Sequence, residues 1–317
     1  MPPLSFTPND KLVLKALCLQ PWANDRELAE AFKINQSTVT SCKNRMRRNG
    51  ICRKAFLPAY NHLGYPLVSF SQLRTGRPPG ELLTALGMYQ DINIGEANKT
   101  LLSFMASDPF NSFVMAHHRD YTAFKKFEKA FGQDTGWSHE VCAMDGATKV
   151  VNFDHINIVN KMFFPGEFMA SAIETQDVAP FEFSRTEAKV FDGFLAYQEG
   201  IFYKIASKTG VTRQSVVKIL GRFKKAGVLE KGYVIDLGRL GLQILSVITF
   251  KMDRPSSKDL ANINRMLAPF YYWVFDNIHV LIIANIDFKG TMGGLGQLNK
   301  VKGVSDLRIQ HIQLGTE

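Results

Sequence analysis

Three successive segments near the start of the chain carry apolar residues at helical spacing. Between residues 10 and 19, apolar side chains fall on one face, as a half-buried helix requires. The second segment, DRELAEAF, follows Asn24, whose side chain can accept the free backbone N–H groups of a helix start, as that of Asp25 can. The third ends at Arg48, before the helix-stopping pair Asn49-Gly50. With ICRKAFLPAY as a short β-hairpin wing, these segments predict a winged helix-turn-helix domain.

The same pattern occurs a second time, 177 residues further along the chain. INQSTVTSCKNRMRRNGI begins at residue 34 and VTRQSVVKILGRFKKAGV at residue 211. Over about sixty residues, apolar positions of the first copy fall on apolar positions of the second without a gap, as a duplicated core requires. The second copy predicts helices at 189–196, 202–208 and 213–225 and a wing from Val228 to Asp236. We therefore expect an internal duplication.

Strand and helix patterns alternate after each predicted wing. In the second half, the order is strand ILSVITFKM, helix SSKDLANINRMLAPF, strands YYWVFD and HVLIIANI, glycine-weakened helix KGTMGGLGQLNKVKGV and strand DLRIQHIQL. This βαββαβ order is the ferredoxin-like plan. The first half predicts the same order more faintly: LVSFSQL, GELLTALGMY, TLLSFMAS, NSFVMAHH, YTAFKKFEKAF and, after an irregular stretch from 132 to 148, KVVNFDHINIV as the last strand.

The predicted fold class is α+β, with two winged helix-turn-helix domains alternating with two ferredoxin-like domains. No apolar run reaches the roughly 18 to 20 residues that span a bilayer, and MPPLSFTPND lacks the features of a signal peptide, so no membrane partner is expected. Cys18, Cys42, Cys52 and Cys142 show no paired spacing, which predicts reduced thiols and a cytoplasmic location. The expected boundaries are 1–65 and 185–242 for the winged helix-turn-helix domains, 66–165 and 243–317 for the ferredoxin-like domains, and 166–184 for the linker.

Positive charge is concentrated in the two repeated segments. Residues 1–75 hold eleven Lys/Arg against four Asp/Glu, and residues 185–243 hold eleven against five. The whole chain carries a formal net charge of +9, so the remainder of the chain is slightly acidic. Basic segments on a less basic body favour a polyanionic partner, and helix-turn-helix segments favour double-stranded DNA.

The third helix of each copy is expected to enter the major groove. Its outward residues near the helix start suit base edges, because Gln, Ser, Thr, Asn and Arg can donate and accept hydrogen bonds there. The base-reading candidates are Gln36, Ser37, Thr40, Ser41, Asn44, Arg47, Arg213, Gln214 and Lys218. The phosphate-contacting candidates, which supply affinity and salt dependence, are Arg45, Arg48, Arg53, Lys54, Arg222, Lys224, Lys225 and Lys231. Lys43 departs from the pattern, because Leu220 takes the equivalent core position in the second copy.

The chain resembles the leucine-responsive regulator (Lrp/AsnC) family, with the family's unit present twice as a tandem duplication. The resemblance is carried by INQSTVTSCKNRMRRNGI and by the pairs Leu63-Gly64 and Leu240-Gly241 after the wings. The resemblance implies a transcription regulator of archaeal or bacterial type, whose C-terminal units pair through their sheets and often respond to a small-molecule effector. We accordingly expect a possible homodimer through the ferredoxin-like sheets. Because helix 36–48 and helix 213–225 differ, the two recognition helices are expected to read non-identical half-sites.

Two other function classes stay open beside the regulator. Proteins related to this family serve as sirohaem decarboxylases, and a third class is a protein-interaction scaffold that does not bind DNA. The basic recognition helices favour the regulator, so we expect no enzyme activity, no cofactor and no metal site. Cys42 could act as a redox switch, although small buried cysteines are commoner. Side chains that could serve acid–base or iron-ligating chemistry are His117, His118, Arg119, Tyr121, His139 and His155, and the second half offers His279 and His311.

Overall fold

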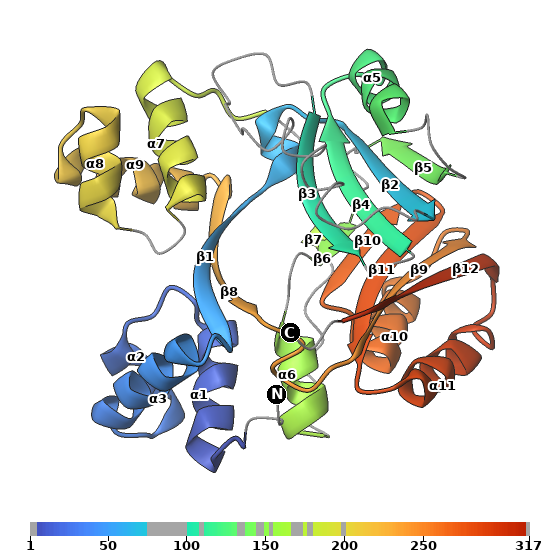
Figure 1. Cartoon of the computed structure of the whole chain (residues 1–317), viewed down its shortest axis with the longest axis horizontal. Coiled ribbons are helices and arrows are strands. Elements are labelled where there is room, and N and C mark those ends of the chain that lie inside the picture. Colours follow the sequence, from blue (N-terminus) through green and yellow to red (C-terminus); the bar gives the residue numbers. More distant parts are fainter. Residues whose placement is uncertain are drawn as a thin grey trace. The chain divides into compact units, whose positions relative to one another are not determined.

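The chain of 317 residues forms a mixed α+β fold in a computed structural model (Figure 1). The structure describes residues 5–74, 100–107, 111–131, 137–143, 149–151, 155–165, 174–175, 180–197 and 201–314. Among the helices in these ranges, none combines the length and the apolar character that crossing a membrane requires.

The chain divides into two compact units that exchange parts of its two halves. The first unit comprises Met1–Lys54, Thr148–Thr175 and Lys231–Glu317, and the second comprises Ala55–Ala147 and Gln176–Glu230. Each unit thus combines the three-helix segment of one half with the larger sheet of the other half. In Figure 1, the first unit holds the dark blue helices and the orange and red strands.

The first three-helix segment consists of α1 (Pro8–Leu19), α2 (Asp25–Phe32) and α3 (Gln36–Arg48). Capping boxes start the first two helices, with Thr7 and Asp10 on α1 and Asn24 and Glu27 on α2. The helices meet around a core that includes the fully buried side chains of Val13, Leu14, Leu28, Val39 and Met46. All three predicted helices are therefore present, and α3 ends at the predicted residue.

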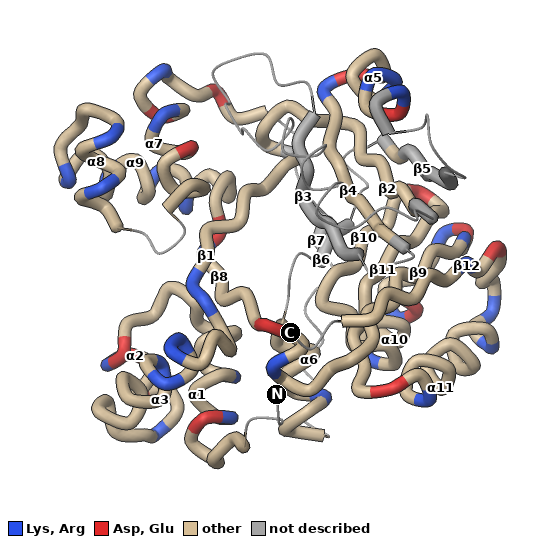
Figure 2. The backbone as a smooth tube through the Cα atoms, in the orientation of Figure 1, with Lys and Arg blue, Asp and Glu red and all other residues tan. Residues whose placement is uncertain are grey.

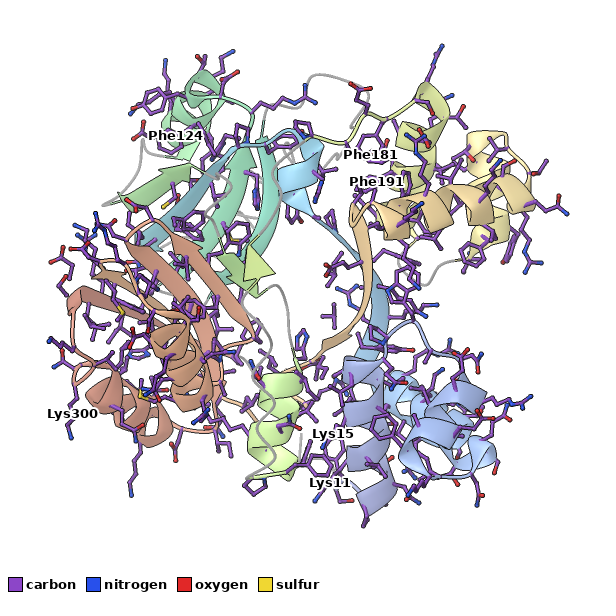
Figure 3. All side chains as sticks on the ribbon, turned by 180° about the vertical axis from the view of Figure 1, so that it is seen from behind. Lys11, Lys15, Phe124, Phe181, Phe191 and Lys300 are labelled. Carbon is purple, nitrogen blue, oxygen red and sulfur yellow. The ribbon has the colours of Figure 1, made fainter. Side chains whose placement is uncertain are left out.

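The second three-helix segment consists of α7 (Arg185–Ala196), α8 (Phe202–Thr209) and α9 (Arg213–Lys225). Helix α7 begins four residues before the predicted 189, because Ser184 and Glu187 form a capping box there. Phe rings fill much of this core: Phe191 meets Phe223 at 5.6 Å and Phe183 at 5.2 Å between ring centroids. Figure 3 labels Phe191 and the neighbouring Phe181.

The predicted wings are wrong, because no hairpin follows α3 or α9 in the described residues. Instead β1 (Cys52–Pro58) and β8 (Leu229–Ile235) pair with each other in a two-stranded sheet. In the first unit the Asp236 amide donates to the Ile51 carbonyl at 2.9 Å, and in the second unit the Ala59 amide donates to the Val228 carbonyl at 3.0 Å. A strand that has found a partner elsewhere needs no return strand of its own.

A six-stranded sheet with the order β12-β9-β11-β10-β6-β7 belongs to the first unit. The elements from residue 244 onward follow the expected βαββαβ order, and two short strands from the middle of the chain extend the sheet. The core lies between the sheet and its two helices and includes Ile248, Ile263 and Leu281. The bounds are β9 (Ile244–Met252), α10 (Ser257–Leu267), β10 (Tyr271–Phe275), β11 (Ile278–Asn285), α11 (Phe288–Leu298), β12 (Val304–Gln313), β6 (Lys149–Val151) and β7 (Glu174–Thr175).

A four-stranded sheet with the order β3-β4-β2-β5 belongs to the second unit. The short 3-10 helix η1 (Tyr60–Leu63) precedes this part of the chain. The described elements then come in the order β2 (Leu67–Arg74), β3 (Thr100–Ser107), β4 (Asn111–His118), α5 (Tyr121–Phe131) and β5 (Trp137–Ala143). The strand order matches that of β10-β11-β9-β12 in the other sheet. The predicted helix GELLTALGMY lies outside the described residues.

The predicted last strand of the first half, KVVNFDHINIV, forms only in part: residues 149 to 151 are the strand β6, which belongs to the six-stranded sheet and not to the sheet of the first half. The fourth strand is β5, inside the stretch expected to be irregular, and residues 156 to 163 form the helix α6 (Ile156–Phe163). This helix packs on α1, and the ring of Phe163 lies 5.1 Å from that of Phe6, which precedes α1. Helical burial of Ile156 and Val159 against neighbours in the first unit outweighs the alternating pattern of the sequence.

Helix α6 also attaches the first three-helix segment to the six-stranded sheet of its unit. Lys11 and Lys15 on α1, both labelled in Figure 3, place their ammonium groups 5.4 and 4.6 Å from the rings of Phe163 and Phe164. Towards the sheet, the side-chain amide of Asn157 donates to the Pro269 carbonyl at 2.9 Å, and the ammonium group of Lys161 donates to the Asn285 side chain at 2.6 Å.

Candidate nucleic-acid interface

Helix α3 presents a polar outward face. Gln36, Ser37, Ser41, Asn44 and Arg47 are exposed, which places them where the sequence predicted. The opposite face is buried through Val39, Cys42 and Met46. In Figure 2, Lys and Arg appear in blue along this helix. The outward side chains are those whose hydrogen-bonding groups match base edges, while their contact with bases stays a prediction.

The side chains of Thr40 and Lys43 are held by one carboxylate on α2. The Thr40 hydroxyl donates to Asp25 at 2.6 Å, and Lys43 forms an ion pair with the other oxygen of Asp25. Burial alone would raise the pKa of Asp25, but the hydrogen bonds from Lys43 and Thr40 outweigh it and lower the pKa below its ordinary value. The polar residue at a core position is thus explained, because the ammonium group of Lys43 leaves the core to meet Asp25.

An ion pair between Arg45 and Asp10 fixes α3 to the start of α1. Asp10 is 3% exposed and also accepts from the Thr7 amide at 3.0 Å. Burial would raise the pKa of Asp10, but the hydrogen bonds from Arg45 and Thr7 lower it below the usual range. Arg45 therefore has a structural partner within the chain, and its predicted phosphate contact stays a prediction.

Helix α9 repeats this anchor at the equivalent positions. Arg222 pairs with Glu187, which is 5% exposed and belongs to the capping box of α7. Burial would raise the pKa of Glu187, but the Ser184 hydrogen bonds and the Arg222 guanidinium lower it. The guanidinium of Arg222 also lies 5.0 Å from the centre of the Phe181 ring. Both anchors were missed from the sequence, although the capping spacings T-x-x-D and S-x-x-E give their carboxylates away.

The outward face of α9 differs in composition from that of α3. Arg213, Gln214 and Lys218 are exposed, as predicted for base-reading side chains. Val217 is also exposed, to 49%, and was not among the predicted site residues. The only signal for it in the sequence is its equivalence to Thr40, 177 residues earlier.

The remaining predicted phosphate contacts lie at the ends of α3 and α9 and on the strands that follow. Arg48, Arg53, Lys224 and Lys225 are exposed, and Lys54 and Lys231 are half-buried. The ammonium group of Lys231 lies 5.5 Å from the centre of the Trp22 ring. Exposed cations at a helix end suit phosphate contacts, so these assignments stay predictions.

The histidine cluster singled out as a catalytic candidate is buried. His118 shares a hydrogen bond of 2.8 Å with Ser69 and touches the rings of Phe124 and Phe127 on α5. His117 stacks on the Tyr60 ring at 4.3 Å. Burial lowers the pKa of His117 to about 3 and that of His118 to about 4, so both are neutral at pH 7. Of the other candidates, His155 is buried, Arg119 and Tyr121 are exposed, and the His139 side chain lies outside the description.

The described cysteines are reduced and mostly buried. Cys42, inside α3, and Cys52 are buried, and burial raises the pKa of both thiols, that of Cys52 to about 11. Raised thiol pKa values disfavour the reactive thiolate. Among the described residues, no group of three or more His, Cys, Asp or Glu could hold a metal ion.

Comparison with known proteins gives a fold and no family. No model of a protein family matches the sequence, and no curated protein matches it. The crystal structure of the siroheme decarboxylase NirDL is similar over 95% of this chain and 90% of its own, with a TM-score of 0.52 and 11% identity. The structure of the same enzyme in co-complex with an iron-uroporphyrin III analogue is similar over 96% of this chain and 90% of its own, with a TM-score of 0.51 and 11% identity. AsnC from E. coli matches 44% of this chain and 92% of its own, with a TM-score of 0.32 and 16% identity.

The expectation that the chain is not an enzyme is wrong on this comparison. Two structures that match nearly the whole chain are structures of an enzyme, and at 11% identity the match establishes a shared fold. The expectation rested on the basic helix-turn-helix segments, which an enzyme does not need. Since an enzyme shares the fold along almost its whole length, those segments do not decide between the two classes of function.

Proposed function

We propose that the chain is a sequence-specific regulator that binds double-stranded DNA through α3 and α9. The observation that carries the proposal is the shared design of the two helices. Each is fixed to the start of its own three-helix segment by one buried carboxylate, Asp10 or Glu187, and turns an exposed polar face outward. A recognition helix must be held rigidly if its side chains are to select base edges.

The two faces favour different half-sites. The outward side chains of α3 include Gln36, Ser37 and Asn44, whereas α9 offers Arg213, Gln214 and Val217. Arg suits guanine O6 and N7, while Gln and Asn suit adenine. One chain with two unlike readers, as an internal duplication would produce, therefore favours a composite site that is not itself a palindrome. If two chains pair as a homodimer, their two-fold axis makes the whole operator a palindrome of two such composite sites. A homodimer formed through the ferredoxin-like sheets and a small-molecule effector remain part of the proposal.

The test is binding of the full chain to random duplex DNA at several salt concentrations. About six phosphate contacts would give a slope near −5 when log affinity is plotted against log salt. Replacing Arg48 and Lys225 by Gln should lower affinity for all sequences and flatten the slope by about two contacts. Replacing Gln36 and Arg213 by Ala should instead relax sequence preference with the slope nearly unchanged. Retention of no duplex at low salt would reject the proposal.

A second candidate function is a tetrapyrrole enzyme, favoured by the fold shared with the siroheme decarboxylase NirDL over 95% of the chain. The burial of His117, His118 and His155 argues against these three as side chains that meet such a ligand. Titration of the purified chain with an iron uroporphyrin, followed by absorbance, distinguishes the candidates. A saturable spectral shift at one equivalent per chain, without DNA retention, would favour the enzyme. Absence of both signals would favour the protein-interaction scaffold.

A further inference from the structure

Two residues on the outward face of α9 do not fit a purely polar reader. Val217 is 49% exposed and lies one helical turn before Gly221, which is also exposed. Residues four apart lie on the same face of a helix, so the two positions form one strip. The strip is flanked by Arg213 and Gln214 at the helix start and by Lys218. An exposed apolar side chain and, one turn later, a position without a side chain therefore lie in the middle of a basic, polar face.

Both residues are unusual choices for an exposed helix face. Valine is branched at Cβ and glycine lacks a side chain, so both are weaker helix formers than the residues usual on a solvent-facing helix surface. A Cβ added at Gly221 would meet no heavy atom within 4 Å, so packing within the chain does not require glycine there. Gly221 thus weakens α9 without a packing gain inside the molecule, and Val217 leaves about half of its apolar surface exposed beside it, which points to a partner outside the molecule.

The equivalent positions on α3 indicate what the partner offers. Thr40 corresponds to Val217, and its hydroxyl is already engaged with Asp25 at 2.6 Å. With that hydroxyl engaged, Thr40 has a methyl group left for an outside partner, and Val217 likewise presents methyl groups. Asn44 corresponds to Gly221, so only α9 combines the methyl group with open space one turn later.

We propose that Val217 contacts the 5-methyl group of a thymine in the half-site bound by α9, and that Gly221 lets the helix backbone approach the groove at that point. The inference rests on the proposed DNA binding and names the base feature that one helix reads. The thymine methyl is the apolar group that base edges present in the major groove, which is why apolar side chains discriminate there. Removing the side chain at 221 brings the backbone closer, as glycine does wherever a chain must approach a ligand.

The experiment uses the full chain and a duplex selected by it from a random pool. Each thymine in turn is replaced by uracil, which removes the methyl group and leaves base pairing unchanged. One buried methyl contact corresponds to roughly a four-fold change in affinity, at about 0.8 kcal/mol per buried carbon. We expect such a loss at one thymine in the half-site protected by α9. The salt dependence should not change, because the methyl group carries no charge.

Two variants at the same position assign the effect to its side chain. Val217→Ala should bind the thymine duplex about four-fold more weakly and no longer distinguish it from the uracil duplex. Val217→Thr keeps one methyl group in nearly the same shape and should keep the discrimination. Because Val217 is exposed, both variants should unfold at close to the wild-type denaturant concentration, which verifies that the fold is retained.

The outcomes separate this inference from the function on which it rests. If the chain binds selected DNA but tolerates uracil at every position, the methyl contact is rejected and the regulator stands. If Val217→Ala still discriminates thymine from uracil as the wild type does, another residue reads the methyl group and the inference is equally rejected. If no duplex is retained at low salt, the proposed function itself fails.

Discussion

At the scale of single residues, three histidines are held neutral inside the protein. Burial lowers the pKa of His118 and of His279 to about 4 in each case, and that of His117 to about 3. His279 shares a hydrogen bond of 2.9 Å with the Tyr272 hydroxyl and stacks on the Phe250 ring. These rings work as core side chains, and their protonation would place a charge in an apolar environment.

The lowered pKa values predict that the protein loses stability in mild acid. A histidine titrates near 6.5 when unfolded, so the unfolded state binds more protons as the pH falls below that value. The contribution is fully present above pH 6.5 and is lost as the pH falls towards 4, at up to about 1.4 kcal/mol per pH unit for each histidine. Urea unfolding at pH 7, 6 and 5 should therefore show a steadily falling free energy of unfolding.

One variant pair assigns part of this slope to His118. His118→Gln removes one titrating group. The pH dependence of the free energy of unfolding between pH 6 and 5 should therefore fall by the contribution of about one bound proton. Ser69→Ala removes the hydrogen bond to the same ring but leaves the histidine in place, so it should lower stability without flattening the slope. Equal slopes in wild type and His118→Gln would show that this histidine is not buried as described.

At the scale of elements, Gly221→Ala is expected to separate helix stability from DNA binding. Alanine should stabilise α9 by about 1 kcal/mol, because it restricts the unfolded chain and favours the helix. Affinity for the selected duplex should nevertheless fall several-fold, because the new methyl group lies on the face that approaches the groove. Gly293→Ala on α11 is the matched control, since a Cβ there also meets nothing within 4 Å. It should gain stability and leave DNA binding unchanged; equal effects of both variants on binding would contradict the prediction.

The helices of the three-helix segments could be predicted from the sequence because their signals are local. The apolar periodicity and the stop at Asn49-Gly50 gave the end of α3, and the same signals gave both bounds of α9. The strand pairing could not be predicted this way. Both β1 and β8 have the pattern of a wing strand, and the partner of a strand depends on contacts between residues almost two hundred positions apart.

Two other elements show where local signals mislead. The sequence KVVNFDHINIV fits both a strand and a helix, and contacts with α1 decide for the helix over most of its second half. Within the described part of the chain, the strand β5 lies at the edge of its sheet beside β2, so it lacks the continuous apolar run of a central strand. Of the candidate site, the outward polar positions were readable from spacing, whereas the anchoring roles of Asp10, Asp25 and Glu187 emerged only from packing.

At the scale of the whole molecule, both halves of the chain are needed to complete each unit. In the first unit, Arg239 donates to the Asn49 carbonyl at 2.7 Å, and Asn157 donates to the Pro269 carbonyl at 2.9 Å. In the second unit, the Phe181 amide donates to the His62 carbonyl at 2.8 Å. Each of these bonds joins a residue before position 166 to one after it. Two independent halves joined end to end would make no such bonds.

A cut between the halves should therefore leave the protein assembled. With a protease recognition sequence inserted after residue 170, the cleaved chain is expected to elute at the size of the intact chain in native buffer and to separate into two pieces only in denaturant. Arg239→Ala removes one bond between the pieces, so they should separate at a lower urea concentration than the cleaved wild type. Lys300 is exposed and is labelled in Figure 3, so Lys300→Ala is the matched control. It should leave the urea concentration at which the pieces separate unchanged. Separation of the pieces in native buffer would mean that each half folds by itself, and the exchange of parts between the halves would be rejected.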